Sequence, residues 1–129
     1  MESEHKKIKS FTDLNAWKEG HKLVIEIYKI TKKFPREEQF GLVMQLRRAV
    51  VSITSNIAEG FSRHSYKEKL QFYFMALSSL TEAQNQLLIS RDIGFLPDEE
   101  FNNISQMTII VSRIINGLIK GTKSIILNS

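Results

Sequence analysis

The chain contains no cysteine, only two prolines and three histidines, and no long uninterrupted run of apolar residues. Without cysteine there is no disulfide framework and no thiolate metal site, so nothing in the sequence requires an oxidising compartment. The N-terminal segment carries charge but no apolar stretch, and the most apolar late segment is interrupted by Arg113, Asn116 and Lys120. We therefore expect no signal peptide, no membrane-spanning helix and a cytoplasmic location.

The residue patterns of catalysis and metal binding are also missing. No serine stands in a recognisable set with a base and an orienting group, and the six glycines are scattered rather than gathered into a phosphate-binding loop. A di-iron site in a helical bundle needs two Glu-x-x-His motifs, but only one occurs, from Glu2 to His5. Neither His21, which we expect at the core or its boundary, nor His64 follows a glutamate at that spacing. We expect no enzyme, no cofactor and no metal.

What the sequence does contain is helical periodicity. With 129 residues, 42% of them hydrophobic and 25% charged, the chain suits one globular domain. Apolar residues recur every three or four positions in four segments, which predicts helices at about 13–33, 35–60, 66–93 and 97–123. The short links between them favour antiparallel neighbours. The predicted fold is an all-α, up-down-up-down four-helix bundle, with a single domain over 12–126 and a flexible basic tail over 1–11.

Residues that begin and end helices mark these boundaries. Pro35 suits the first position of the second helix, because its missing N–H has no partner there in any case. The spacing of Ser65 and Glu68 is that of a capping box, which predicts the start of the third helix. Gly94 supplies a residue that adopts the left-handed conformation cheaply and so ends that helix.

Polar residues follow one line of the second predicted helix beside its apolar stripe. They are Arg48, Ser52, Asn56 and Glu59. One interpretation is a structural, hydrogen-bonded strip, because buried polar groups usually have partners. The other is a subunit interface or a ligand-binding strip. Glu82, on the third helix, is a possible ion-pair partner for an arginine of the second, Arg47 or Arg48, or else a solvated charge.

Positive charge is expected to gather at one end of the bundle. The net charge is +4 and the isoelectric point is near 9.4. In an up-down bundle, one end collects ten Lys and Arg residues against six Asp and Glu residues, whereas the other end has seven of each. The candidate phosphate-binding residues at the first end are Lys18, Arg63, Lys67, Lys69, Lys120 and Lys123. The alternative is a solvated, solubilising surface.

Several aromatic side chains could instead suggest a stacking surface for single-stranded nucleic acid. Their helical spacing favours packing in the core for most of them. Phe72 and Phe74 are the best candidates among them for a contact between subunits. The aromatic residues considered are Trp17, Tyr28, Tyr66, Phe72, Tyr73 and Phe74.

The second helix also carries a specific motif. It consists of Phe34-Pro35, Gly41-Leu42, Gln45-Leu46-Arg47-Arg48-Ala49, Val51-Ser52-Ile53 and Ser55-Asn56-Ile57-Ala58-Glu59-Gly60, with supporting residues Asp13-Leu14, Trp17, Ala76, Ser79-Leu80, Glu82, Gln86-Leu87 and Gly94. The chain thereby resembles the bacterial four-helix-bundle family of 23S rRNA intervening-sequence proteins over about residues 11–120. Leu77, Ser78 and Ala83 depart from the usual pattern of the third helix.

The resemblance implies a homopentameric ring and a relationship to the accessory protein of diversity-generating retroelements, which binds nucleic acid and a reverse transcriptase. In a ring, the basic ends would lie together and their fields would add, which favours binding of polyanions. We therefore expect a non-enzymatic homo-oligomer that binds RNA or DNA backbone through a basic rim. The alternative is a protein-protein scaffold without nucleic-acid binding.

Overall fold

The computed structural model describes residues 7–129. Its elements are a 3-10 helix at Phe11–Asp13, α1 at Asn15–Thr31, a second 3-10 helix at Arg36–Glu38, α2 at Leu42–Ser62, α3 at Tyr66–Asp92 and α4 at Asp98–Leu127. The residues described contain no strand. The predicted all-α class with four long helices is confirmed.

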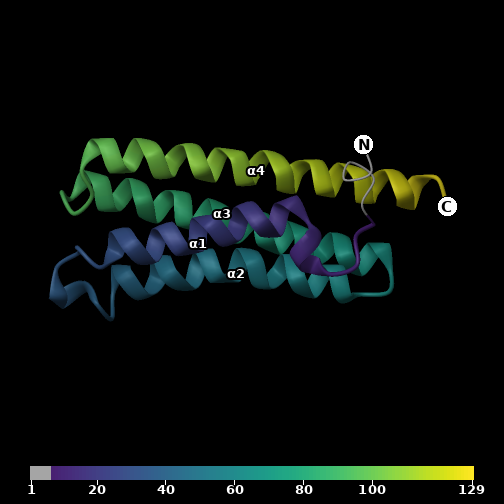
Figure 1. Ribbon diagram of the computed structural model, residues 1–129, viewed down its shortest axis with the longest axis horizontal. Helices are drawn as coiled ribbons and strands as arrows, with labels where there is room; N and C mark the ends of the chain where they lie inside the picture. Colours follow the sequence, from purple (N-terminus) through teal and green to yellow (C-terminus); the bar gives the residue numbers. More distant parts are fainter. Residues whose placement is uncertain (1–6) are drawn as a thin grey trace.

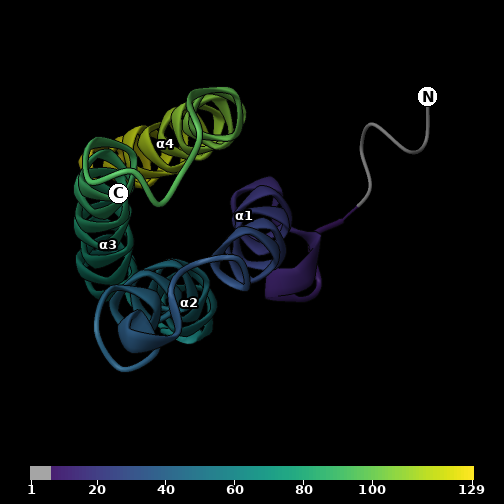
Figure 2. The same cartoon turned by 90° about the vertical axis from the view of Figure 1, so that its left-hand side faces the viewer.

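Successive helices run in opposite directions along the molecule (Figure 1). α2 packs against α1 and α3, and α4 packs against α3 and α1. In the part of the chain described, the diagonal pairs α1–α3 and α2–α4 do not approach each other closely. Viewed along the bundle, the four helices surround a common centre (Figure 2). This arrangement agrees with the up-down-up-down order expected from short links.

The core consists of the apolar stripes that the sequence pattern predicts. Each helix contributes large side chains that are essentially inaccessible to solvent. Burial of each such side chain contributes about 1.5–3 kcal/mol relative to exposure. The largest of them are Leu23, Ile27, Leu46, Ile53, Ile57, Leu80, Leu87, Ile104 and Ile115.

Two of the predicted helix boundaries have the expected geometry. The Ser65 Oγ accepts a hydrogen bond of 3.0 Å from the Glu68 backbone N–H, so Ser65 caps the start of α3; in the described residues the Glu68 carboxylate does not accept from the Ser65 N–H, so the predicted capping box is half formed. Gly94 has a φ of 88°, and its N–H donates to the Arg91 carbonyl at 3.0 Å. A side chain at Gly94 would be strained in this left-handed conformation, which explains why a glycine follows α3.

The prediction that Pro35 opens the second helix is wrong. Pro35 precedes the short 3-10 helix Arg36–Glu38, and α2 begins only at Leu42. The Glu38 Oε1 accepts from the Leu42 backbone N–H at 3.2 Å, so this carboxylate caps α2 across the intervening turn. Glu37 and Glu38, which lie inside the predicted range 35–60, therefore precede α2.

The described part of the predicted basic tail also differs from the expectation of a loose segment. Ser10 accepts from the Thr12 backbone N–H, and Asp13 accepts from the Ser10 backbone N–H, which together form a capping box around the first 3-10 helix. The Phe11 ring then packs edge-on against Trp17, with centroids 5.5 Å apart. Glu2 and His5, the single Glu-x-x-His motif, lie outside the described residues.

Candidate nucleic-acid interface and polar row

The predicted cation-rich region lies at the right-hand end of the bundle in Figure 1, where α2 connects to α3 and α4 ends. We call this the basic end and define it by Lys18, Arg63, Lys67, Lys69, Lys120 and Lys123. These residues come from the start of α1, the link between α2 and α3, the first turn of α3 and the last turns of α4.

Three of these cations are free of intramolecular partners. Lys18, Lys67 and Lys120 are exposed, and within residues 7–129 their ammonium groups make no hydrogen bond or ion pair. Their charge is therefore available to a ligand. Since long exposed side chains can reorient freely, these lysines can follow a phosphate backbone without first breaking a contact.

Two further cations lie over aromatic rings. The Arg63 guanidinium carbon is 4.6 Å from the centroid of the Phe72 ring, and the Lys123 Nζ is 5.2 Å from that of Phe74. Cation–π contacts orient a side chain without neutralising its charge. Arg63 and Lys123 thus keep their positive charge on this surface.

Lys69 has a structural role that its place in the charge pattern does not indicate. Its ammonium donates to the Phe61 carbonyl at 2.6 Å and lies 3.5 Å from the Gly60 carbonyl. Both carbonyls belong to the last turn of α2, but the Gly60 carbonyl already accepts from the Arg63 N–H at 3.2 Å, so the acceptor that Lys69 satisfies is the Phe61 carbonyl. Burial lowers the pKa of the Lys69 ammonium below its usual value. Lys69 is therefore the least available of the six predicted phosphate ligands.

In the described part of the chain, the acidic residues of the basic end do not pair with Lys18, Lys67 or Lys120. Glu19 pairs with Lys22 at 3.0 Å, and Asp13 accepts hydrogen bonds from backbone N–H groups near the start of the chain. Glu59 and Glu68 are exposed. The free cations therefore have no acidic side chain paired with them in the described residues.

At the opposite end, which we call the balanced end, several cations have partners. Lys33 pairs with Glu100 at 3.5 Å, and Arg91 pairs with Asp92 at 2.9 Å. The Arg91 guanidinium also lies 4.5 Å from the Phe101 ring centroid. These contacts hold the links between helices at that end.

The predicted polar row of α2 divides into a bonded half and a free half. The Ser52 and Ser79 hydroxyls lie 2.9 Å apart and link α2 to α3. Asn56 is 9% exposed, and its Nδ2 donates to the Ser52 carbonyl and hydroxyl oxygens at 2.9 and 3.1 Å. These residues form a hydrogen-bonded strip, as the structural interpretation predicts.

The remaining members of the row do not belong to that strip. Arg48 and Glu59 are exposed, and neither side chain makes a hydrogen bond within residues 7–129. Glu82 accepts from the Gln86 Nε2 at 3.2 Å instead of pairing with an arginine. Arg48 and Glu82 nevertheless border the same hollow of about 280 Å³ between α2 and α3.

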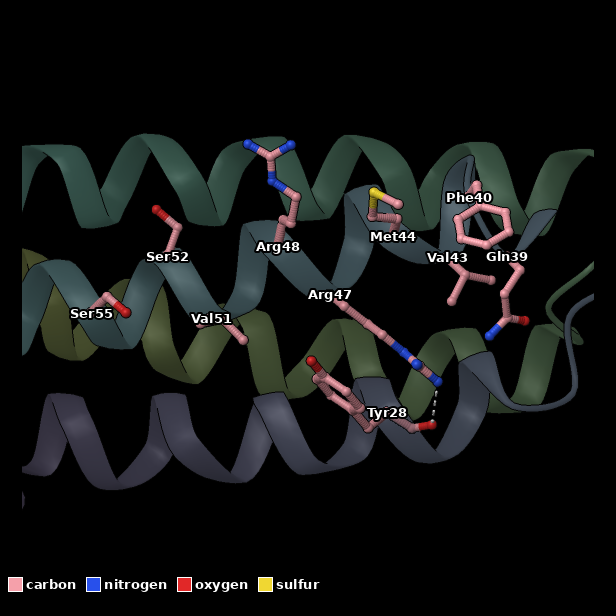
Figure 3. A pocket seen from close by; sticks show the side chains of 10 residues that line it. All are labelled: Tyr28, Gln39, Phe40, Val43, Met44, Arg47, Arg48, Val51, Ser52 and Ser55. Carbon is pink, nitrogen blue, oxygen red and sulfur yellow. Dashed lines mark hydrogen bonds between the residues drawn. The ribbon is translucent and has the colours of Figure 1, made fainter.

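Arg47, one of the two arginines considered as a partner for Glu82, contacts α1 instead. The Arg47 Nε donates to the Thr31 hydroxyl at 3.0 Å, and its guanidinium lies 4.4 Å from the Tyr28 ring centroid (Figure 3). Arg47 therefore ties α2 to α1.

A groove that the sequence pattern does not reveal lies beside Arg47. It has a volume of about 640 Å³, and Figure 3 shows its lining side chains, most of them on α2 and the turn before it. Phe40 is 85% exposed there, and Met44 and Val51 are also exposed. Arg47 and Arg48 are the charged residues of the lining, which contains no acid. The groove is thus an apolar surface with a positive edge.

Two aromatic residues expected in the core, Tyr28 and Tyr66, are at the surface, and Phe74, a candidate for a contact between subunits, is exposed as well. Tyr73 is buried, and Trp17 and Phe72 are half-buried, but Tyr28, Tyr66 and Phe74 are exposed. Trp17 stacks on His21, with ring centroids 4.6 Å apart, so this exposed histidine lies at the boundary of the core. Helical spacing alone did not distinguish the rim of each stripe from its centre.

The described residues contain neither a cluster of metal ligands nor a membrane-spanning helix. Nowhere in 7–129 do three or more His, Asp or Glu side chains converge as ligands for a metal ion. Among the helices of this part of the chain, none is long and apolar enough to cross a bilayer.

Comparison with known proteins gives a family match and similar solved structures. A family model described as 23S rRNA-intervening sequence protein matches residues 12–117. Among solved structures, a protein of unknown function from the S23 ribosomal protein family of Bacteroides thetaiotaomicron has a TM-score of 0.76 and 19% identity, covering 81% of this chain and 95% of that chain. Comparison with curated proteins gives no match. The structural likeness shows the fold, and the family model spans most of the chain.

Proposed function

The chain belongs to the family of 23S rRNA-intervening sequence proteins, and from this premise we propose that it is a non-enzymatic homo-oligomer that binds the phosphate backbone of RNA or DNA. The binding surface of this proposal is the basic end. The main phosphate-binding residues of this surface are Lys18, Lys67 and Lys120, and Arg63 and Lys123 lie at the same end. Lys69 contributes mainly by capping α2.

The observation that carries this proposal is a set of exposed, unpaired cations at the end of the bundle where Lys and Arg outnumber Asp and Glu; Lys29, Lys32 and Arg36 at the balanced end are also unpaired in the described residues, but acidic residues there are equally numerous. Lys18, Lys67 and Lys120 are exposed, and no acidic side chain of the described residues pairs with them. Each phosphate that such a cation neutralises releases condensed counterions, which favours binding without reading the base sequence. The family description names 23S rRNA, so RNA is the first polyanion to test.

The homo-oligomer, a pentamer as the family resemblance implies, is supported by apolar surface. Ile25, Phe74 and Ile110 are each more than 40% exposed, as is Phe40 in the groove of Figure 3. Exposed apolar patches often mark an interface. We propose the groove as the contact with a second copy of the chain. Ile30 and Ile119, by contrast, are buried in the bundle and are not available to an interface.

The salt dependence of binding tests the nucleic-acid proposal. Binding of a duplex RNA should weaken steeply with salt, log K falling by about 0.9 per neutralised phosphate for each unit of log salt concentration. Changing Lys67, Lys120 and Lys123 together to glutamine should flatten that slope. The matched control changes Lys29, Lys32 and Arg36, exposed cations of the balanced end, to glutamine and should preserve it.

Equal losses from both triplets would contradict a localised binding end. Absence of binding even at about 50 mM salt, where screening is weak, would favour the protein-scaffold alternative. Light scattering tests the oligomer separately, and a monomer mass at micromolar concentration would contradict it.

A further inference from the structure

A second hollow lies at the basic end and is distinct from the groove of Figure 3. Its volume is about 390 Å³. The walls come from the N-terminal part of α3, the C-terminal part of α4, the end of α2 and the segment before α1. The aromatic side chains that line it are Phe61, Tyr66 and Tyr73. The free cation Lys67 follows Tyr66 on α3, and Lys120 precedes Gly121, another lining residue, on α4.

The Tyr73 hydroxyl is a polar group in this hollow without a partner. Tyr73 as a whole is 3% exposed, and within residues 7–129 its hydroxyl makes no hydrogen bond. In this part of the chain, the Gln86 Oε1 is the side-chain polar atom that is both fully enclosed and without a partner. The Tyr73 hydroxyl, which also lacks a partner, is therefore not fully enclosed, and the open space beside Tyr73 is this hollow. A ligand that fills the hollow would give this hydroxyl of the lining a hydrogen-bond partner.

Lys69 adds a second donor to the same wall. An ammonium has three N–H donors, and those of Lys69 face the Phe61 and Gly60 carbonyls at 2.6 and 3.5 Å. The longer contact is weak. The Lys69 ammonium also lies within 6 Å of the Phe61 and Tyr66 ring centroids, at 5.3 and 5.9 Å. The hollow thus combines aromatic walls with hydrogen-bond donors.

Two glycines keep the α4 side of the hollow open. Gly117 and Gly121 line it, and a Cβ added at either position would meet no atom within 4 Å. The space is therefore not filled by a neighbouring helix.

We propose that this hollow receives an unstacked base of a single-stranded nucleic acid bound at the basic end. The inference rests on the proposed function and adds a preference for unpaired strands. An aromatic wall stacks with any base, and the Tyr73 hydroxyl and Lys69 ammonium meet the carbonyl or ring-nitrogen acceptors of its edge. Phosphates on either side of that base reach the free ammonium groups of Lys67 and Lys120. A duplex would first have to break pairing and stacking to present a base.

The test compares a single-stranded RNA oligonucleotide of mixed, non-self-complementary sequence with the duplex that it forms with its complement. Gly121→Leu should fill the hollow without strain, because leucine is a better helix former than glycine and the position is open. We expect about a tenfold loss of affinity for the single strand. Affinity for the duplex should stay unchanged, as should the salt dependence of single-strand and of duplex binding, because the lysines that bind phosphate are intact.

The matched control is Ser124→Leu, which adds the same side chain at an exposed position of α4 outside the lining of the hollow. It should bind both probes like the parent. Tyr73→Phe keeps the ring and removes only the hydroxyl. It should weaken single-strand binding about threefold and leave duplex binding unchanged.

The outcomes separate this inference from the proposed function. Unchanged single-strand affinity in both Gly121→Leu and Tyr73→Phe would overturn the base-binding hollow, while the response to the lysine triplet would still support backbone binding. Equal losses for single strand and duplex would also overturn it. If the parent binds neither probe, the inference and the proposed function both fail.

Discussion

The two ends of the bundle use their cations differently. At the balanced end, Lys33 pairs with Glu100, and Arg91 pairs with Asp92 while covering Phe101. At the basic end, Lys69 is the cation with a comparable structural task, and Lys67 and Lys120 are free in the described residues. The balanced end also has exposed cations without partners in the described residues, such as Lys29 and Lys32. The two ends differ in charge balance, because acidic residues match the cations in number at the balanced end but not at the basic end.

The links between helices differ in the same way. The link from α2 to α3 at the basic end is residues 63–65, and at the balanced end the links are residues 32–41 and 93–97. The short link requires close packing: a Cβ on Gly60 would lie 2.7 Å from the Tyr73 Cε1 and 2.9 Å from the Phe72 Cβ. The longer links of the balanced end contain the 3-10 helix Arg36–Glu38 and Gly94, whose φ is positive.

The largest expected effect would disrupt the tight link. Gly60→Val should lower the free energy of unfolding by about 3 kcal/mol, because its branched side chain would overlap the Tyr73 ring. Gly94→Ala at the balanced end should cost only about 1–2 kcal/mol, from its positive φ alone. Urea denaturation measures both variants. A smaller loss for Gly60→Val than for Gly94→Ala would show that the two links do not differ in tightness.

A smaller effect separates the bonded half of the polar row from Glu59, its exposed member nearest the basic end. Asn56→Leu should cost about 1–2 kcal/mol, because it removes two hydrogen bonds to Ser52 from a buried position. Glu59→Leu should change stability by at most about 0.5 kcal/mol, since that side chain is exposed. Thermal melts of both variants test this contrast. Loss of a partner with unchanged melting in both would instead make the row a binding site.

The next largest expected effect is the contrast between Lys69, which caps α2, and Lys67, which has no partner in the described residues. Lys69→Met should cost about 1 kcal/mol, because the Phe61 carbonyl in the last turn of α2 loses its ammonium donor in a partly exposed setting. Lys67→Met, two residues away and exposed, should leave the free energy of unfolding within about 0.5 kcal/mol of the parent. In the binding assay the order should reverse, with Lys67→Met the more damaging. Equal effects in both assays would remove the distinction.

The smallest expected effect appears at alkaline pH. Burial, and then the neighbouring Tyr66, raises the pKa of Tyr73 above its ordinary 10.0. The folded state therefore holds this proton longer than the unfolded state, so stability is lost as pH rises from about 10 through the folded pKa. Tyr73→Phe should make that decline shallower. The lowered pKa of Lys69 acts in the opposite direction just below its ordinary 10.5, so Lys69→Met should make the decline steeper.

Urea denaturation of the three proteins over this alkaline range, with measurements at pH 7 as the reference, checks both signs. An identical pH dependence for the parent and Tyr73→Phe would contradict the first assignment.

Much of the fold follows from local signals in the sequence. The four apolar stripes, Ser65 as the cap of α3 and Gly94 after it all lie where periodicity and turn chemistry predict them. The motif in α2 also identified the family, which the match over residues 12–117 confirms. The start of α2 was missed because Glu38 caps it from outside, and nothing in the local pattern distinguishes a carboxylate before a helix from one in its first turn.

The candidate site was predictable in its charge but less so in its contacts. Counting charges along an up-down bundle located the cation-rich end, because topology assigns each helix terminus to one end. It did not separate Lys69, which binds the Phe61 carbonyl, from Lys67, which binds nothing in the described residues. The hollow beside Tyr73 also has no sequence signature, since it depends on how α3 and α4 diverge around Gly117 and Gly121.

The sequence by itself determined the helices, their order and the sign of the charge at each end, because these depend on residues close together in the chain and on links too short for other connections. Only the tertiary structure decided which polar groups find partners. Ser52 meets Ser79 and Arg47 meets Thr31 across helices, whereas Glu59 and Arg48 face solvent. The physical reason is that a hydrogen bond requires atoms within about 3 Å of each other, and the rotation and separation of packed helices set those distances.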